Sequence, residues 1–159
     1  GIGFGLAATA RVGQSVGARS LHTAAGVARI ATTWAVLWMS AIAAILFVAA
    51  PQVMAAFTND PAVVAVGAAA LRVVAFTQPF WAIGMVRSGA LRGTGDTRYP
   101  LIISATGMWT AVAIVWAVLT FWGGELATVW TAFLFTSPIT ALVTWLRFRV
   151  RVRELAAEM

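Results

Sequence analysis

The polarity pattern of the chain alternates between long uncharged apolar runs and short charged segments. No charged side chain occurs in residues 30–59, 99–124 or 126–146. About 20 apolar residues are enough for a helix to cross the hydrocarbon core of a bilayer. The pattern therefore predicts membrane-spanning helices at about 28–49, 100–121 and 126–146, and residues 1–11 are expected to be part of a further span.

The apolar run between these helices is interrupted by Arg72 and Arg87. A charge at the centre of a bilayer costs about 2.5–3.5 kcal/mol or more. A span over 70–91 avoids this cost, because the two arginines then lie about 22 Å apart and each can extend to its own interface. Residues 61–69 are then expected to form a short helix at the surface or leading into the span.

Proline and aspartate residues mark where these helices begin, end and bend. Pro51 is predicted to stop the helix over 28–49. Asp60 is expected to cap a helix that opens at Pro61, because its carboxylate can accept from free N–H groups of the first turn. Pro79 lies inside the span over 70–91, where its ring and its missing N–H should kink the helix.

Composition agrees with a membrane protein: 61% of the residues are hydrophobic and 10% are charged, with a mean hydropathy of +0.89. Soluble domains have about a quarter of their residues charged. We therefore predict an all-α, polytopic membrane helical bundle. The chain has no cysteine and no enzyme motif, so no metal site, cofactor or enzymatic activity is expected.

The net charge of +6 comes entirely from arginine, because the chain contains no lysine. Such a balance would suggest nucleic acid in a soluble protein, but here the arginines fall between the spans, and no nucleic-acid partner is expected. Apart from Arg72, they gather in residues 11–29, residues 87–98 and the tail 147–159. The turns 50–61 and 122–125 contain no arginine, and their charged residues are Asp60 and Glu125. If the spans alternate, the basic segments share one side, which is predicted to be cytoplasmic, with the C-terminus inside the plasma or inner membrane.

Two motifs carry a family resemblance. Residues 91–100 (LRGTGDTRYP), preceded by Gln78, Pro79 and Gly89, resemble the LRGxGDTRxP signature of the multidrug and toxic compound extrusion (MATE) transporters. Residues 10–18 (ARVGQSVGA) are similar to the VGQxLGA cytoplasmic loop of that family. The resemblance covers essentially the whole chain. It implies the C-terminal part of a twelve-helix transporter, a partial lobe that lacks its N-terminal lobe.

The resemblance implies secondary active multidrug efflux, in which amphiphilic, often cationic, compounds leave as protons or sodium ions enter. One branch of the family places a coupling acid in the stretch that corresponds to residues 76–87, where this sequence has none. All of the acids lie outside the predicted spans: Asp60, Asp96, Glu125, Glu154 and Glu158. The coupling site is therefore expected in the missing N-terminal lobe, which favours protons over sodium as the coupling ion.

Polar residues inside the spans are candidates for a substrate cavity. They are Thr77, Gln78 and Pro79 in the kinked span, Trp81 one turn further on, and Thr136 and Thr140 on one face of the last span. Polar groups in kinked spans often line transport pathways. The alternative is helix–helix packing, with the polar groups hydrogen-bonded between helices. The first interpretation predicts a water-accessible cavity, and the second does not.

A second group of candidates belongs to the two basic loops and is expected to form a cytoplasmic gate. It consists of Arg92, Gly93, Gly95, Asp96 and Arg98, together with Gly13, Gln14 and Gly17. Asp96 could pair with an arginine as a latch, or simply cap the next helix, and capping is the favoured reading. Gly13 and Gly17 have the spacing of a close helix contact, but a turn or helix end is favoured there.

Two alternatives to multidrug efflux stay open at this point. One is a lipid-linked saccharide flippase of the same superfamily, which would share the architecture. The other is a membrane scaffold module that does not transport. A water-accessible polar face on the spans would distinguish transport from the scaffold.

Overall fold

The computed structural model describes residues 1–121 and 126–158, which are helical apart from short connections. The expected turn at residues 122–125, including Glu125, lies outside the described residues. The helices are α1 (Ile2–Gly17), α2 (Leu21–Val48), α3 (Ala50–Ala55), α4 (Pro61–Gly93), α5 (Arg98–Phe121) and α6 (Leu126–Glu158). The all-α prediction is confirmed. α2, α4, α5 and Val129–Glu158 of α6 are long and apolar enough to cross a membrane.

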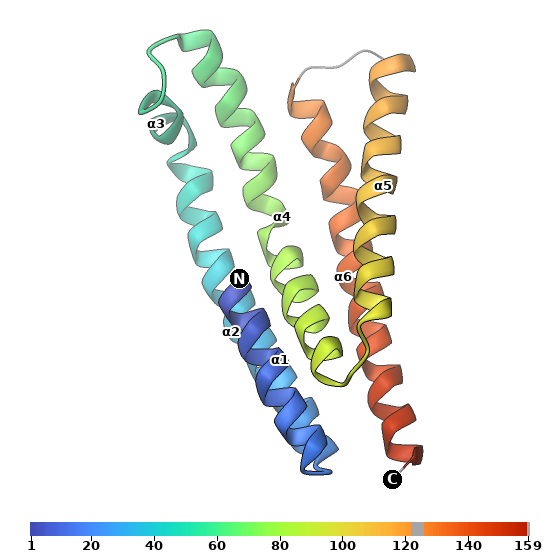
Figure 1. The fold of residues 1–159 in the computed structure, drawn as a ribbon. Helices are drawn as coiled ribbons and strands as arrows, with labels where there is room; N and C mark the ends of the chain where they lie inside the picture. Colours follow the sequence, from blue (N-terminus) through green and yellow to red (C-terminus); the bar gives the residue numbers. More distant parts are fainter. Residues whose placement is uncertain (122–125, 159) are drawn as a thin grey trace.

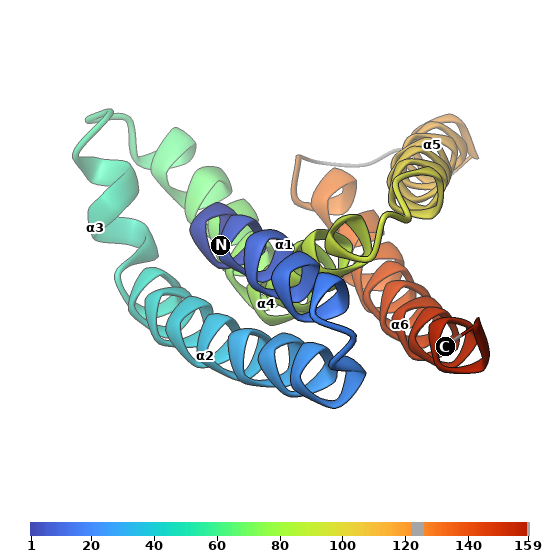
Figure 2. The same cartoon turned by 60° about the horizontal axis from the view of Figure 1, so that its bottom comes forward.

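α4 lies at the centre of the bundle and contacts all of the other described helices. α1 and α2 pack on one side of it, whereas α6 packs on another side and carries α5 (Figure 1 and Figure 2). The α1–α2 connection, the α4–α5 loop and the end of α6 lie together at one end of the bundle (Figure 1). We call this end, with residues 18–20, 94–97 and 147–158, the basic end.

The core of the bundle is built from small residues, and the large apolar residues point outward. The buried cluster includes Ala8, Ala24, Ala28, Ala35, Ala82 and Ala90. Small side chains allow helix backbones to approach closely, as membrane helices do. Large side chains such as Trp34, Trp38 and Trp109 are at least 60% exposed. This inside-out distribution suits a bundle whose outer surface meets lipid.

α1 crosses α4 with backbones almost in contact. Thr9 Oγ1 donates to the Gly89 carbonyl across the helices at 2.9 Å. A Cβ on Gly93 would lie 2.6 Å from the Thr9 carbonyl oxygen and 3.1 Å from Gly13 N. The prediction of a turn or helix end at Gly13 was wrong, because α1 continues to Gly17 and uses Gly13 for this contact. Gly17 is the last residue of α1, so the predicted helix end fits Gly17 alone.

α4 is a single helix of 33 residues, so residues 61–69 do not form the separate helix that was expected. Ala68 in this stretch and Ala70 just beyond it are buried, so neighbouring parts of the bundle pack against this end of α4. The sequence did not reveal this packing. The predicted cap is confirmed, because Asp60 Oδ1 accepts from Ala62 N at 2.9 Å. The helix continues through Pro79 without interruption.

The structure also places the tail and two arginines of α4, Arg72 and Arg87. The tail continues α6 as a helix to Glu158 and buries Phe148 in the core. Arg72 is exposed and donates from Nε to the Phe47 carbonyl at 3.3 Å, whereas Arg87 is buried. Arg87 is only 8% exposed and stacks on the Phe148 ring. The sequence treated the two arginines alike, but α6 packs over only one of them.

Candidate functional site

A cavity of about 660 Å³ lies between α4, α5 and α6. Its aromatic lining residues are Phe80, Trp81, Trp130 and Phe133, and its polar ones include Thr77, Gln78, Ser88, Ser104, Thr136, Ser137, Thr140 and Thr144. Binding sites for small molecules typically enclose about 300–1,000 Å³ and combine apolar walls with a few polar groups. The cavity therefore has the size and chemistry to hold an amphiphilic small molecule.

The structure brings five of the six predicted cavity residues together: Thr77, Gln78, Trp81, Thr136 and Thr140 all line this cavity. Pro79 does not, and instead lines a groove of about 270 Å³ between α2 and α4. Successive residues of a helix point about 100° apart, so neighbours in sequence can serve different faces. The sequence grouped Pro79 with its neighbours by proximity, and the helical period separates it from them.

The threonine hydroxyls of the cavity are already hydrogen-bonded within their own helices. Thr136 Oγ1 donates to the Ala132 carbonyl at 3.1 Å, and Thr140 Oγ1 donates to the Thr136 carbonyl at 3.0 Å. These bonds run along α6, whereas the packing interpretation placed them between helices. A hydroxyl that donates its proton keeps lone pairs that accept a bond. The stripe can thus offer acceptors to a ligand in the cavity.

Arg92 is the only charged residue among the described lining residues. It was predicted as a loop residue, but α4 continues to Gly93 and places Arg92 in the last helical turn, where it reaches the cavity. Its Nε donates to the Ser88 carbonyl at 3.3 Å. Residues 74, 77, 81, 84, 88 and 92 recur every three or four positions, and this signal could have placed Arg92 on the lining face.

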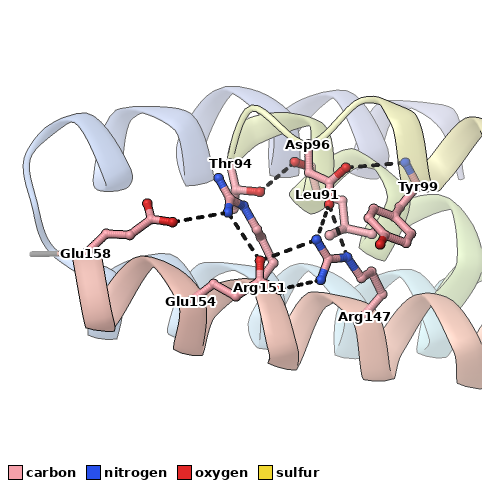
Figure 3. Close-up of polar contacts among 8 residues, drawn as sticks. All are labelled: Leu91, Thr94, Asp96, Tyr99, Arg147, Arg151, Glu154 and Glu158. Atoms are coloured by element: carbon pink, nitrogen blue, oxygen red, sulfur yellow. Dashed lines mark hydrogen bonds and ion pairs between the residues drawn. The ribbon is translucent and has the colours of Figure 1, made fainter.

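Asp96 links the α4–α5 loop to α6 at the basic end (Figure 3). Its Oδ2 accepts from Arg147 Nη2 at 3.0 Å and from Arg147 Nε at 3.2 Å, while its Oδ1 accepts from Tyr99 N at 3.3 Å. The Arg147 guanidinium also lies over the Tyr99 ring, 3.9 Å from its centroid. Asp96 therefore both bonds the first turn of α5 and forms an ion pair, so the contacts for both readings are present, and the latch itself stays a prediction.

The same ion pair extends along α6 into a ladder of charges (Figure 3). Arg147 Nη1 bonds Glu154 Oε1 at 2.7 Å, and Arg151 Nη1 bonds Glu154 Oε2 at 3.2 Å. Arg151 is also 3.8 Å from Glu158. The hydrogen bond from Arg147, followed by that from Arg151, lowers the pKa of Glu154, and the Glu154 carboxylate raises the pKa of Arg147. Both groups are therefore charged at neutral pH.

The predicted loop residues do not form one cluster. Gly13 and Gly93 meet where α1 crosses α4, and Asp96 pairs with α6. Gln14, Gly17 and Arg98 are exposed, as is Gly95, whose φ of 83° suits a glycine in the turn. The partner of Asp96 is neither Arg92 nor Arg98, which flank it in sequence. It is Arg147, 51 residues away, and no local signal pointed to it.

No cluster of three or more potential metal-ligating side chains occurs in residues 1–121 and 126–158. Asp96 and Glu154 each pair with arginine. In the described part of the chain, the candidate functional features are therefore the cavity and the ladder of ion pairs at the basic end.

Residues 1–119 match the model of the MatE family. A probable multidrug resistance protein NorM of Thermotoga maritima is 31% identical over 109 residues, which cover 69% of this chain and 24% of that protein. Another, of Xanthomonas campestris, is 32% identical over 164 residues, covering 98% and 34%. The human multidrug and toxin extrusion protein 1 is 27% identical over 150 residues, covering 88% and 26%. The chain thus spans about a quarter to a third of these relatives.

Two solved structures share the fold. An inward-facing MATE transporter of the MOP superfamily superposes with a TM-score of 0.88 at 22% identity, over 96% of this chain and 36% of that one. An outward-facing MATE transporter superposes with a TM-score of 0.86 at 22% identity, over 94% and 34%. The arrangement of these helices is thus similar to that in structures of both conformations.

Proposed function

The chain belongs to the MATE family of multi-pass membrane transporters, and on this premise we propose that it lines part of a multidrug-efflux pathway. The transported compounds are amphiphilic or cationic small molecules, and they leave in exchange for a coupling ion. The observation that carries the proposal is the cavity between α4, α5 and α6, with its aromatic and hydroxyl lining. The transporter is proposed to lie in the plasma or inner membrane, with the basic end in the cytoplasm.

The lining explains how an amphiphilic cation could bind without a carboxylate. None of the described lining residues is acidic, but Trp81 and Trp130 offer aromatic faces that attract cations. Thr136 and Thr140 can accept hydrogen bonds from the polar part of the compound. Weak contacts of these kinds suit a site that accepts chemically different compounds.

Coupling is proposed to come from an N-terminal lobe beyond this sequence. Within the described part of the chain, Asp60 caps α4, and Asp96, Glu154 and Glu158 pair with arginines outside the cavity. None of these acids lines the cavity. The proposal therefore favours protons over sodium, as in the branch of the family that places its coupling acid in that lobe.

The ion pair of Asp96 with Arg147 is proposed to act as a latch at the cytoplasmic end. It ties the loop after α4 to α6, so the helices around the cavity move together when the transporter changes conformation. Gly13 and Gly93 similarly tie α1 to α4.

Cysteine labelling tests the pathway directly, because the chain has no cysteine of its own. Single cysteines replace Gln78, Trp81 or Thr136 in the full polypeptide that carries this chain. A membrane-impermeant, water-soluble thiol reagent should label all three, and a transported dye should slow the labelling. The matched control is Leu142→Cys, because Leu142 is 54% exposed and does not line the cavity. If the control is labelled as fast as the three cavity positions, the cavity is not an aqueous pathway.

Dye efflux from cells then tests the coupling. Efflux should stop when a proton uncoupler is added and should continue when sodium is replaced. Efflux that depends on sodium and survives loss of every acid in the N-terminal lobe would contradict the proposed coupling.

One observation favours the flippase alternative. Arg92 brings a positive charge to the cavity, which suits the phosphate of a lipid-linked saccharide better than a cationic drug. Arg92→Gln separates the two functions: it should leave efflux of a cationic dye unchanged or increase it, whereas a flippase should lose activity. A non-transporting scaffold predicts neither labelling nor efflux.

A further inference from the structure

Arg87 is a buried cation that lacks a partner of opposite charge. It lies two turns before the end of α4, and its side chain is covered until only 8% of the residue is exposed. Its Nε is buried without a hydrogen-bond partner, and no described acid forms an ion pair with it. Its guanidinium carbon lies 5.3 Å from the centroid of the Phe148 ring, which makes a cation–π contact.

An unpaired charge in this position is costly. Removing a charge from water costs several kcal/mol unless another group compensates it. The negative end of the α4 dipole and the face of Phe148 each offset only about 1–2 kcal/mol. Arg92, one turn further along α4, avoids this desolvation cost, because it is exposed to solvent and donates a hydrogen bond to a backbone carbonyl. Arg87 therefore lacks an anionic ligand.

An apolar groove lies beside α4, further from the basic end than Arg87. It encloses about 270 Å³ between α2 and α4, and its lining includes Ser40, Ala44, Phe47, Phe76, Pro79 and Phe80. On α4, the residues Phe76, Phe80 and Arg87 are spaced by four and seven positions, so they lie on one helix face. Arg87 is seven residues, or about 10 Å, beyond Phe80 towards the basic end. Figure 2 shows α2 and α6 on the two sides of this part of α4.

We propose that this groove binds an anionic phospholipid from the leaflet at the basic end. The phosphate pairs with the Arg87 guanidinium, and an acyl chain follows the α4 face past Phe80 into the groove between α2 and α4. A phospholipid carries its charge at the interface and points its apolar chains to the membrane centre, which matches this arrangement. The groove shares Phe80 with the drug cavity, whose other lining residues on α5 and α6 do not belong to the groove.

The test uses the purified full polypeptide that carries this chain, in detergent. Its unfolding temperature is measured while phosphatidylglycerol, phosphatidylcholine or inorganic phosphate is added. Phosphatidylglycerol should raise the unfolding temperature of the wild type, and the other two should have little effect. Arg87→Met should weaken the apparent affinity for phosphatidylglycerol about tenfold or more, because it removes hydrogen bonds to a charged group. Arg87→Lys should retain part of the response.

Two further variants sharpen the result. Ala44→Phe fills the groove without touching Arg87 and should also weaken the response, because Ala44 is an exposed lining residue. Arg11→Met is the matched control, because it removes the same charge from an exposed position on α1, and it should respond as the wild type does. Without added lipid, Arg87→Met should be at least as stable as the wild type, because it replaces an unpaired charge with an apolar chain.

Four outcomes would overturn the proposal. Arg87→Met could keep the full response to phosphatidylglycerol, or Arg11→Met could lose as much of it, which would indicate a general surface-charge effect. Inorganic phosphate could stabilise the wild type as well as the lipid does, which would remove the acyl chain from the site. Arg87→Met could be strongly destabilised without lipid, which would mean that an acid elsewhere in the polypeptide is the partner of Arg87.

Discussion

The crossing of α1 and α4 makes a quantitative prediction about Gly89. A Cβ at this position would lie 2.9 Å from the carbonyl carbon of Gly5 and 3.1 Å from its Cα, and closer still to its oxygen. Carbon atoms in contact prefer about 3.5–4.0 Å, so Gly89→Ala must push the two helices apart by several tenths of an ångström or more. Because the obstacle is backbone, no side-chain rotation can relieve it.

The size of the effect follows from three terms. Overpacking typically costs about 1–3 kcal/mol. Separating the helices also weakens the hydrogen bond from Thr9 Oγ1 to the Gly89 carbonyl, and such a bond in a membrane protein contributes about 0.6 kcal/mol. Replacing glycine by alanine in a helix returns about 1 kcal/mol. We expect Gly89→Ala to lower the free energy of unfolding by about 0.6–2.6 kcal/mol in total.

Gly84→Ala is the matched control, because a Cβ there meets nothing within 4 Å and the residue lies on the same helix. It should be neutral or stabilising by up to about 1 kcal/mol. Reversible unfolding of both variants in mixed detergent micelles measures the difference. If Gly89→Ala proves as stable as Gly84→Ala, the close approach of α1 and α4 is refuted.

Three other predictions concern the basic end and the middle of α4. Asp96→Asn should keep most of the cap on α5 but lose the ion pair with Arg147. A double-mutant cycle with Arg147→Met should therefore give a coupling free energy of about 1–3 kcal/mol. The absence of coupling would contradict the latch. The pKa of Glu154 is lowered, so its ion pairs stabilise the tail above the ordinary carboxyl pKa and are lost as pH falls through the lowered value. The protection of the α6 tail against hydrogen exchange, relative to the free peptide at the same pH, should therefore fall only below the ordinary carboxyl pKa, whereas Glu154→Gln should reduce it already at neutral pH. Pro79→Ala should restore a backbone hydrogen bond and slow dye efflux if bending at Pro79 is needed, whereas normal efflux would exclude a gating role.

Local patterns predicted the elements well where a single segment holds the signal. The uncharged runs predicted helices over 28–49, 100–121 and 126–146; the last two lie within α5 and α6, and the first runs one residue past the end of α2. The Asp60 cap was predictable because the cap and its acceptor site are two residues apart. Four of the five cavity residues were recognised as polar groups inside apolar runs, and Trp81 was recognised by its proximity to them.

The errors arose where a residue's environment comes from another helix. Arg72 and Arg87 look alike in sequence, but α6 packs its Phe148 over Arg87 alone. In the sequence Gly13 looks like a turn residue, but in the structure it lies within α1 and contacts Gly93 of α4. Asp96 has two arginines close by in sequence and pairs with neither, because Arg147 of α6 approaches it instead.

The sequence by itself determined that the chain is a bundle of membrane-capable helices, that its basic segments gather at one end, and to which family it is similar. These properties follow from the polarity of contiguous residues, because hydrophobic burial and backbone hydrogen bonding within a helix are local. The tertiary structure alone decided which polar residues share a cavity, that Arg87 is buried without a described acid beside it, and which distant side chain pairs with Asp96. Those properties depend on how helices cross, and the crossing is set by contacts between small residues far apart in the chain.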